Sequence, residues 1–148
     1  MKVGNMMSRS PRSVSPTESI AGVAALMADA DVGALPVVDD GSIVGIVTDR
    51  DLAIRGLAAG LHGGAPVFRA MTRNVATCGP DDELADVLAG MAEQQVRRMP
   101  VCSADGELVG MVALGDAARS EEYAGEAAEA LGAICRPHGR HCQSLRAA

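Results

Sequence analysis

A hairpin followed by the start of a helix is predicted by the stretch GALPVVDDGSIVGIVTDRD, residues 33–51. Two apolar runs lie on either side of Asp39-Asp40-Gly41, and an Asp-Gly pair between such runs is typical of a tight β-turn. The second run ends at Thr48, and the charged residues after it favour a helix. We expect this helix to begin one or two residues after Thr48 and to end near Gly60.

The residues before this stretch predict another helix. Ser15-Pro16-Thr17-Glu18 has the pattern of an N-cap, a proline at the first helical position and a glutamate that closes a capping box, so we expect the helix to begin there. Apolar residues then recur at helical spacing and predict one buried stripe: Ile20, Val23, Ala24 and Met27. With a strand before the helix, the order β-α-β-β-α predicts an α+β fold with helices on one face of a small sheet.

The same order of signals occurs twice in the chain. Val3 aligns with Val67 at an offset of 64 residues, and one extra residue in the turn near Asp105 changes the offset to 65. Over the 49 positions from Val3 to Asp51, 17 are identical between the two copies. The second copy repeats the helix stripe and the hairpin, with Leu84, Val87, Leu88 and Met91 in the helix and Met99–Cys102 and Leu108–Val112 in the strands.

The repeat divides the chain into three segments. The predicted boundaries are residues 1–62 for the first copy, 63–120 for the second copy and 121–148 for a C-terminal tail, with Gly60–Pro66 as the linker. A unit of about 60 residues buries little surface by itself, so we expect the two copies to pack on each other.

Composition excludes several classes of function. The chain has 148 residues, a formal net charge of −6 and two aromatic residues, so it lacks the basic surface and the stacking platforms of nucleic-acid binders. No apolar run is long enough to cross a bilayer, and the N-terminus has no secretory h-region, so we expect a cytoplasmic protein without a membrane contact. Phosphate-loop, dinucleotide, serine-hydrolase and zinc-protease motifs are absent from the sequence, which argues against an enzyme.

The repeated hairpin resembles the CBS domain, the regulatory module named after cystathionine β-synthase. Gly33–Asp39 with Val44–Asp51, and in the second copy Val96–Val101 with Val109–Val112, carry the resemblance, which covers about residues 1 to 120. The stretch from Thr48 to Gly60 is also similar to small stand-alone bacterial proteins of two CBS domains. The resemblance implies a pseudo-two-fold pair of copies, a homodimer, and adenosine-containing ligands bound in clefts between the copies.

The residues after the first hairpin suit a nucleotide. The start of a helix offers free amides to a phosphate, Thr48 adds a hydroxyl, and a carboxylate at Asp51 can accept two hydrogen bonds from a ribose diol. In the CBS family the motif Gly-x-x-Thr/Ser-x-x-Asp has these roles, and the resemblance implies them for Gly45, Thr48 and Asp51. Thr48 and Asp51 also have the spacing of a capping box, which needs no ligand.

The second copy departs from this motif. Asp116 remains, whereas Ala113 stands where the first copy has Thr48. A carboxylate without its capping hydroxyl favours ribose binding, while the missing hydroxyl weakens the case for phosphate. We therefore expect the two sites to be unequal.

Basic and apolar residues complete the candidate site. Arg97 and Arg98 offer planar donor groups to phosphate in place of the missing hydroxyl, and Arg50 is a weaker candidate of the same kind. A solvated face or an ion pair is the alternative for them. An apolar slot for adenine is predicted from four residues, each of which also suits a plain core position: Val14, Leu35, Ile46 and Met111.

The tail contains a predicted acidic helix, Glu121–Leu131, in which Tyr123, Ala127 and Leu131 are spaced to cover an apolar surface. After it come four residues that can bind zinc, Cys135, His138, His141 and Cys142, although their spacing matches no standard zinc finger. A tail that is disordered or contacts a partner is the alternative. Cys78 and Cys102 fall on predicted strands and are expected to be buried thiols.

These observations predict a non-enzymatic sensor. It would bind an adenosine-containing ligand such as AMP, ATP or S-adenosylmethionine, need no cofactor, and signal to a separate protein target. Two alternatives stay open: a metal- or redox-responsive protein that uses the Cys/His tail, and a structural dimerisation module with degenerate sites.

Overall fold

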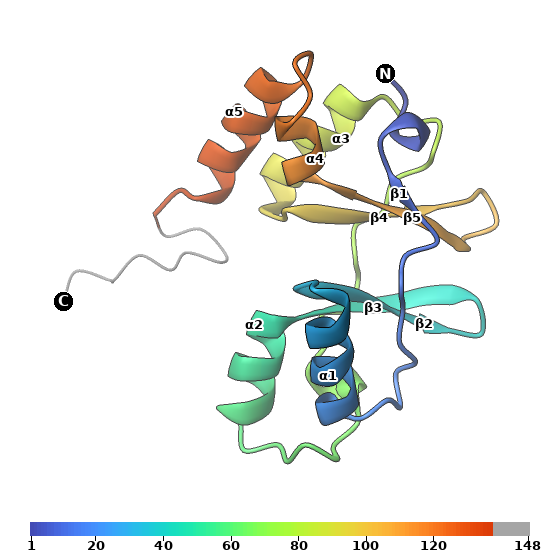
Figure 1. Cartoon of the computed structure of the whole chain (residues 1–148), viewed down its shortest axis with the longest axis vertical. Coiled ribbons are helices and arrows are strands. Elements are labelled where there is room, and N and C mark those ends of the chain that lie inside the picture. Colours follow the sequence, from blue (N-terminus) through green and yellow to red (C-terminus); the bar gives the residue numbers. More distant parts are fainter. Residues whose placement is uncertain (138–148) are drawn as a thin grey trace. The chain divides into compact units, whose positions relative to one another are not determined.

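The computed structural model describes residues 1–137, and these form two compact units (Figure 1). The α1 unit consists of Ser10–Val75 and the turn Ala104–Leu108. The α3 unit consists of Met1–Arg9, Ala76–Ser103 and the residues from Val109 onward. Each unit therefore combines segments from both sequence repeats. Each unit contains both α-helices and β-strands, as the α+β prediction requires.

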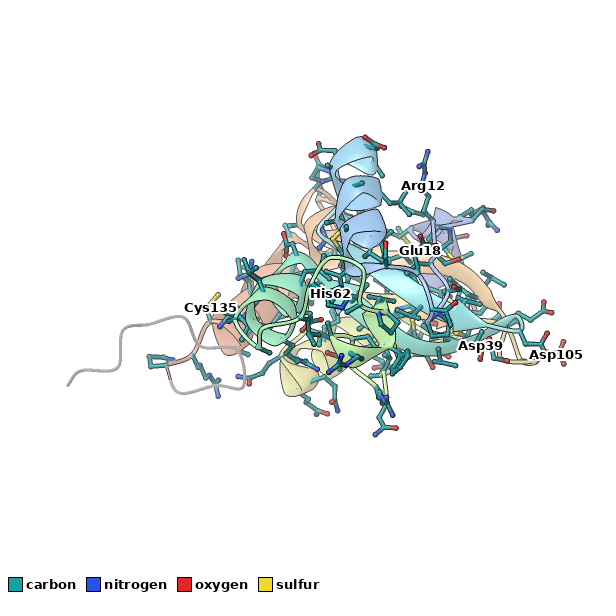
Figure 2. All side chains as sticks on the ribbon, turned by 90° about the horizontal axis from the view of Figure 1, so that it is seen from below. Arg12, Glu18, Asp39, His62, Asp105 and Cys135 are labelled. Atoms are coloured by element: carbon teal, nitrogen blue, oxygen red, sulfur yellow. The ribbon has the colours of Figure 1, made fainter. Side chains whose placement is uncertain are left out.

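The α1 unit is built on the first predicted hairpin. Strands β2 and β3 pair in antiparallel fashion, with Pro36 opposite Ile46 and a bulge between Val37 and Val38. The elements are α1 (Ile20–Ala30), β2 (Ala34–Asp39), β3 (Ser42–Thr48), α2 (Asp49–Asp51), the π-helical η2 (Leu52–Leu57) and η3 (Val67–Arg69). The hairpin turn follows Asp39. The turn Ala104–Leu108 lies beside it, because an antiparallel bridge joins Ser42 to Glu107, and Figure 2 labels Asp39 and Asp105 at this place.

Helix α1 begins later than the sequence predicts. Its N-cap is Ser19, whose hydroxyl accepts a hydrogen bond from the Gly22 amide at 3.0 Å. The prediction of a start at Ser15 is wrong because the carbonyls of Pro16 and Glu18 accept hydrogen bonds from the amides of Phe68 and Val67, at 3.0 and 2.8 Å. A helix that began at Ser15 would need those two carbonyls for its own first turn.

The buried stripe of α1 is also narrower than predicted. Val23 and Met27 are buried and Ile20 packs against the same core, whereas Ala24 is exposed. The core of the unit is formed by α1, the β2–β3 hairpin and η2, with Leu35, Val37 and Val47 among its least exposed side chains.

The α3 unit repeats this arrangement and adds one helix. Its sheet has the order β1-β5-β4. The elements are η1 (Val3–Asn5), β1 (Ser8–Arg9), α3 (Leu84–Gln94), β4 (Arg98–Cys102), β5 (Leu108–Ala113), α4 (Leu114–Ala118) and α5 (Ala124–Ile134). All four predicted stripe residues of α3 are buried, which confirms the second amphipathic helix.

In each copy the first strand of the predicted order is reduced to one bridging residue. Val14 pairs in parallel with Val37 in the α1 unit, and Cys78 pairs in parallel with Val101 in the α3 unit. The two bridges occupy aligned positions of the repeat, so the internal symmetry read from the sequence extends to the backbone pairing.

The copies exchange the short segments that precede these bridges. Ser8 of the first copy pairs with Met111 on β5 of the α3 unit, and Thr72 of the second copy pairs with Ile46 on β3 of the α1 unit. Ile46 and Thr72 are joined by two backbone hydrogen bonds of 3.0 and 2.8 Å. Each sheet is therefore extended by a segment of the other copy.

Helix α5 confirms the predicted tail helix, with a shifted face. It packs on α3 and α4 through Ala127, Ala130 and Ile134, next to the buried Tyr123. Leu131 was predicted to join this face but is 43% exposed, and it lines the open pocket beside α5 together with Ala124, Ala127 and Ala128. Within residues 1–137 no helix has the length and apolar character needed to cross a membrane.

Candidate functional site

The first motif forms a closed capping box. The Thr48 hydroxyl accepts a hydrogen bond from the Asp51 amide, and the Asp51 Oδ2 accepts one from the Thr48 amide, both at 3.0 Å. The other oxygen of Asp51, Oδ1, forms an ion pair with Arg55 Nη2 at 3.1 Å. Asp51 is 9% exposed. Its carboxylate is therefore nearly buried, and each of its two oxygens has a partner within the protein.

Arg55 ties this box to the exchanged segment of the second copy. Its guanidinium donates to the Met71 carbonyl at 3.1 Å and to the Thr72 hydroxyl at 2.8 Å. The capping interpretation of Thr48 and Asp51 thus describes the hydrogen bonds in the structure. A ribose that binds to Asp51 would have to share these oxygens with Arg55 and the Thr48 amide.

The second motif is open. Ala113 is the N-cap of α4 and has no side chain to cap it, as the sequence indicates. The Asp116 carboxylate forms an ion pair through Oδ1 with Arg119, one helical turn later. In the part of the chain that the structure describes, no second group donates to this carboxylate, and the Asp116 side chain is 27% exposed.

A backbone hydrogen bond places the arginines beside this motif. The Leu114 amide donates to the Arg97 carbonyl at 2.9 Å, which holds the start of α4 against the residue before β4. The aligned bond in the first copy, from the Asp49 amide to the Gly33 carbonyl, measures 3.0 Å. The fold thus brings the residue before the second strand to the start of the following helix in each copy.

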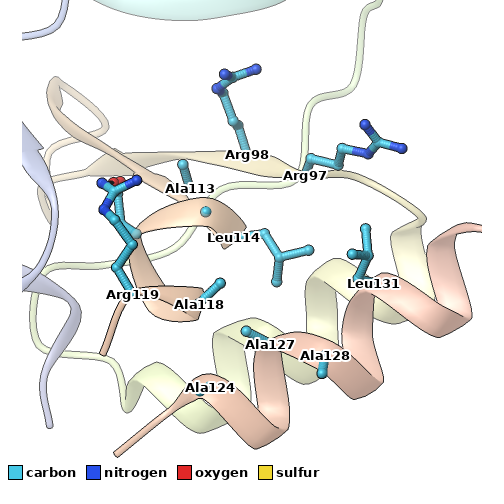
Figure 3. Close-up of a pocket in the computed structure, with 12 residues that line it drawn as sticks. Arg97, Arg98, Ala113, Leu114, Ala118, Arg119, Ala124, Ala127, Ala128 and Leu131 are labelled. Atoms are coloured by element: carbon cyan, nitrogen blue, oxygen red, sulfur yellow. Dashed lines mark hydrogen bonds and ion pairs between the residues drawn. The ribbon is translucent and has the colours of Figure 1, made fainter. Parts of the chain in front are cut away.

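A pocket of about 510 Å³ lies at this place in the α3 unit. It is bounded by the start of β4, by α4 and by α5, and three predicted site residues line it: Arg97, Arg98 and Asp116. Figure 3 shows the arginines on the β4 side and the small side chains Ala124, Ala127 and Ala128 on the α5 side. The pocket combines cationic groups, one carboxylate and an apolar wall, which is a suitable lining for an organic anion.

Two features of this pocket were missed by the sequence analysis. Arg119 lines it and holds Asp116, and α5 supplies one wall. The i, i+3 spacing of Asp116 and Arg119 is a signal that could have identified Arg119. The pocket wall on α5 depends on how α5 packs on α4, and no local pattern in the sequence indicates that packing.

The other predicted site residues are divided between the units. In the α1 unit, Val14 and Leu35 belong to the hydrophobic core, Ile46 is half-buried opposite Thr72, and Arg50 is exposed. In the α3 unit, Met111 is 9% exposed and lies opposite Ser8 on β5. The adenine slot predicted from these apolar residues stays a prediction.

Of the predicted zinc ligands, His138, His141 and Cys142 lie outside the described residues. Cys135, at the end of α5, is exposed (Figure 2). Arg97 Nη2 lies 3.8 Å from the Cys135 Sγ. Among residues 1–137 no group of three His, Cys, Asp or Glu side chains could hold a metal ion.

Cys78 and Cys102 are free thiols. Burial, with a smaller contribution from nearby Asp82, raises the pKa of the Cys78 thiol to about 11. Burial also raises the pKa of Cys102. Both thiols are therefore protonated near neutral pH, as expected of structural cysteines and not of reactive ones.

Comparison of the sequence with known protein families finds the same repeat. The family model of the CBS domain matches residues 3–56 and again residues 67–122. The chain belongs to the CBS domain family. A CBS domain-containing protein of Bacillus subtilis, YhcV, is 41% identical over 128 residues, which cover 84% of this chain and 91% of YhcV.

Solved CBS proteins have the same fold. Hypoxic Response Protein I, solved with two coordinated zinc ions, has a TM-score of 0.74 and 35% identity, and the match covers 80% of this chain and 98% of that one. CBSX2 in complex with AMP has a TM-score of 0.68 and 30% identity, over 78% and 91% of the two chains. The CBS pair of MJ0100, in complex with 5′-methylthioadenosine and S-adenosylmethionine, has a TM-score of 0.73 and 29% identity, over 80% and 94%.

Proposed function

We propose that this protein is a non-catalytic regulator that binds an adenosine-containing ligand in the pocket of the α3 unit. The observation that carries the proposal is the convergence of Arg97, Arg98 and Asp116 on one pocket. The arginines suit a phosphate, and the half-buried Asp116 carboxylate suits the two hydroxyls of a ribose. Solved structures of relatives support this class of ligand, because CBSX2 is in complex with AMP and MJ0100 with 5′-methylthioadenosine and S-adenosylmethionine.

The ligand would act by changing the populations of existing conformations of the CBS pair, because a ligand shifts an equilibrium only through its different affinity for two states. We further propose that the signal passes from the two CBS domains, residues 3–56 and 67–122, to a separate protein target. We further propose a cytoplasmic homodimer as the acting form.

Isothermal titration calorimetry tests the proposed ligand class. AMP, ADP, ATP, NAD(H) and S-adenosylmethionine would each be titrated into the unmutated chain and into Asp116→Asn and Asp51→Asn. We expect at least one ligand to bind, and we expect Asp116→Asn to weaken it about tenfold, because a carboxylate that accepts two hydroxyl hydrogen bonds is lost.

The matched variant at the aligned position is the control. Asp51→Asn changes a carboxylate that is already engaged by Thr48 and Arg55, so we expect it to leave the affinity within about twofold while it lowers stability. Absence of binding by the unmutated protein would refute the proposed function. A larger loss in Asp51→Asn than in Asp116→Asn would move the site to the first copy.

A further inference from the structure

Three arginines line the pocket of the second copy, whereas the motif of the first copy carries its arginines, Arg50 and Arg55, at other positions. Arg97, Arg98 and Arg119 line the pocket with one carboxylate, Asp116, so three positive charges face one negative charge. The aligned residues of the first copy are all uncharged: Gly33, Ala34 and Ile54. The two copies have thus diverged at the positions that set the charge of this pocket, although the protein as a whole is acidic.

Arg119 is the group that decides whether Asp116 is available. Its guanidinium pairs with Asp116 Oδ1, and no other donor holds that carboxylate in the described part of the chain. The Arg119 side chain is 75% exposed, and ion pairs of such exposed groups contribute little to stability. The pair can therefore open at little cost when another anion takes the place of the carboxylate at Arg119.

The first copy shows the contrasting arrangement. Asp51 is 9% exposed, its second oxygen is used by the Thr48 amide, and Arg55 is held by the exchanged segment. Release of Asp51 would break several hydrogen bonds at once. Of the two aligned carboxylates, Asp116 is the one that a ligand can free by a single exchange.

We propose that Arg119 is a specificity-determining residue that makes this pocket select phosphorylated adenosine ligands over uncharged or cationic ones. The inference rests on the proposed function. A 5′-phosphate takes the Arg119 guanidinium from Asp116, and the freed carboxylate accepts the ribose hydroxyls. An adenosine ligand without a phosphate has to break the Asp116–Arg119 ion pair and offers Arg119 no new anionic partner. The sulfonium of S-adenosylmethionine brings a further positive charge to a lining that already has an excess of positive charges.

The test compares two ligands that share adenosine and differ at the 5′ position. AMP carries a phosphate there, and 5′-methylthioadenosine carries a neutral methylthio group. Calorimetry at one fixed ionic strength would measure both with the unmutated chain, Arg119→Gln, Arg119→Lys and Arg73→Gln. Arg73 is exposed and lies outside the pocket, so its variant controls for the loss of one surface charge.

We expect the two ligands to respond in opposite directions. The unmutated chain should bind AMP at least about tenfold more tightly than 5′-methylthioadenosine. Arg119→Gln should weaken AMP by about tenfold and leave 5′-methylthioadenosine unchanged or tighter, because Asp116 is then free from the start. Arg119→Lys should keep most of the preference for AMP, and Arg73→Gln should keep all of it.

Equal affinities for the two ligands in the unmutated chain would overturn the inference and leave the proposed function standing. A parallel loss of both ligands in Arg119→Gln, or the same loss in Arg73→Gln, would overturn it as well. If neither ligand binds the unmutated chain, the inference fails, and the proposed function fails with it only when ADP, ATP, NAD(H) and S-adenosylmethionine do not bind either.

Discussion

Gly45 and Gly110 occupy aligned positions where another part of the backbone comes too close for a side chain. A Cβ on Gly45 would lie 2.8 Å from the Thr72 carbonyl oxygen and 2.6 Å from the Met71 sulfur. On Gly110 it would lie 3.0 Å from the Ser8 carbonyl oxygen. These glycines belong to the family motif, and their place in this fold is to admit the exchanged segments.

Gly45→Ala should therefore destabilise the protein. The methionine side chain can move away from a new methyl group, but the Thr72 carbonyl is held by two backbone hydrogen bonds to Ile46. We expect a loss of about 1 to 3 kcal/mol in the free energy of unfolding, the usual cost of overpacking. Urea denaturation followed by circular dichroism would measure it.

Gly90→Ala is the matched control, because Gly90 lies inside α3 with open space around its Cβ position. It should stabilise the protein by about 0.5 to 1 kcal/mol, since alanine is the better helix former. A Gly45→Ala variant as stable as the unmutated chain would mean that β3 and the Thr72 segment are not held as closely as described.

At the scale of elements, α5 is the helix that this chain adds to the second CBS domain. The family model ends at residue 122, and α5 begins at Ala124. Its buried face packs on α3 and α4, and the buried Ala127 lines the pocket together with the exposed Ala124 and Ala128. Small side chains at these positions leave room for a ligand, so α5 both closes and shapes the pocket.

Ala128→Leu should fill part of the pocket without changing any charged group. We expect the affinity for AMP to fall by about tenfold, since a ligand would have to displace the larger side chain. Glu129→Leu places the same side chain on the next residue of α5, outside the pocket lining, and should leave the affinity unchanged. Fluorescently labelled AMP and an anisotropy titration would measure both variants. An unchanged affinity in Ala128→Leu would exclude α5 from the ligand site.

The elements show where sequence reasoning succeeds. The hairpins, α3 and the start of α2 could be predicted because local signals decide them: a turn pair, an apolar period and a capping residue. The start of α1 could not, because residues 67 and 68 take the carbonyls of Pro16 and Glu18. The role of Arg119 and the pocket wall on α5 also depend on contacts between elements, which no single window of sequence contains.

At the scale of the whole molecule, the residues that the two copies share explain the fold, and the residues in which they differ explain the candidate site. Identical residues such as Gly45 and Gly110 keep the exchanged strands in place in each copy. The copies also differ at the motif after each hairpin, where the first copy has a closed capping box and the second has an open carboxylate among arginines. We infer that the first copy has a structural role there and that the second provides the ligand site.

A crystal structure of the full chain with AMP tests this central claim most directly. The account predicts density for one AMP per chain in the pocket of the α3 unit, with the ribose hydroxyls on Asp116, the phosphate on Arg119 and its neighbouring arginines, and the Asp116–Arg119 pair opened. Density for AMP on Thr48 and Asp51, with the Arg55 pair broken and the α3-unit pocket free of ligand, would contradict it.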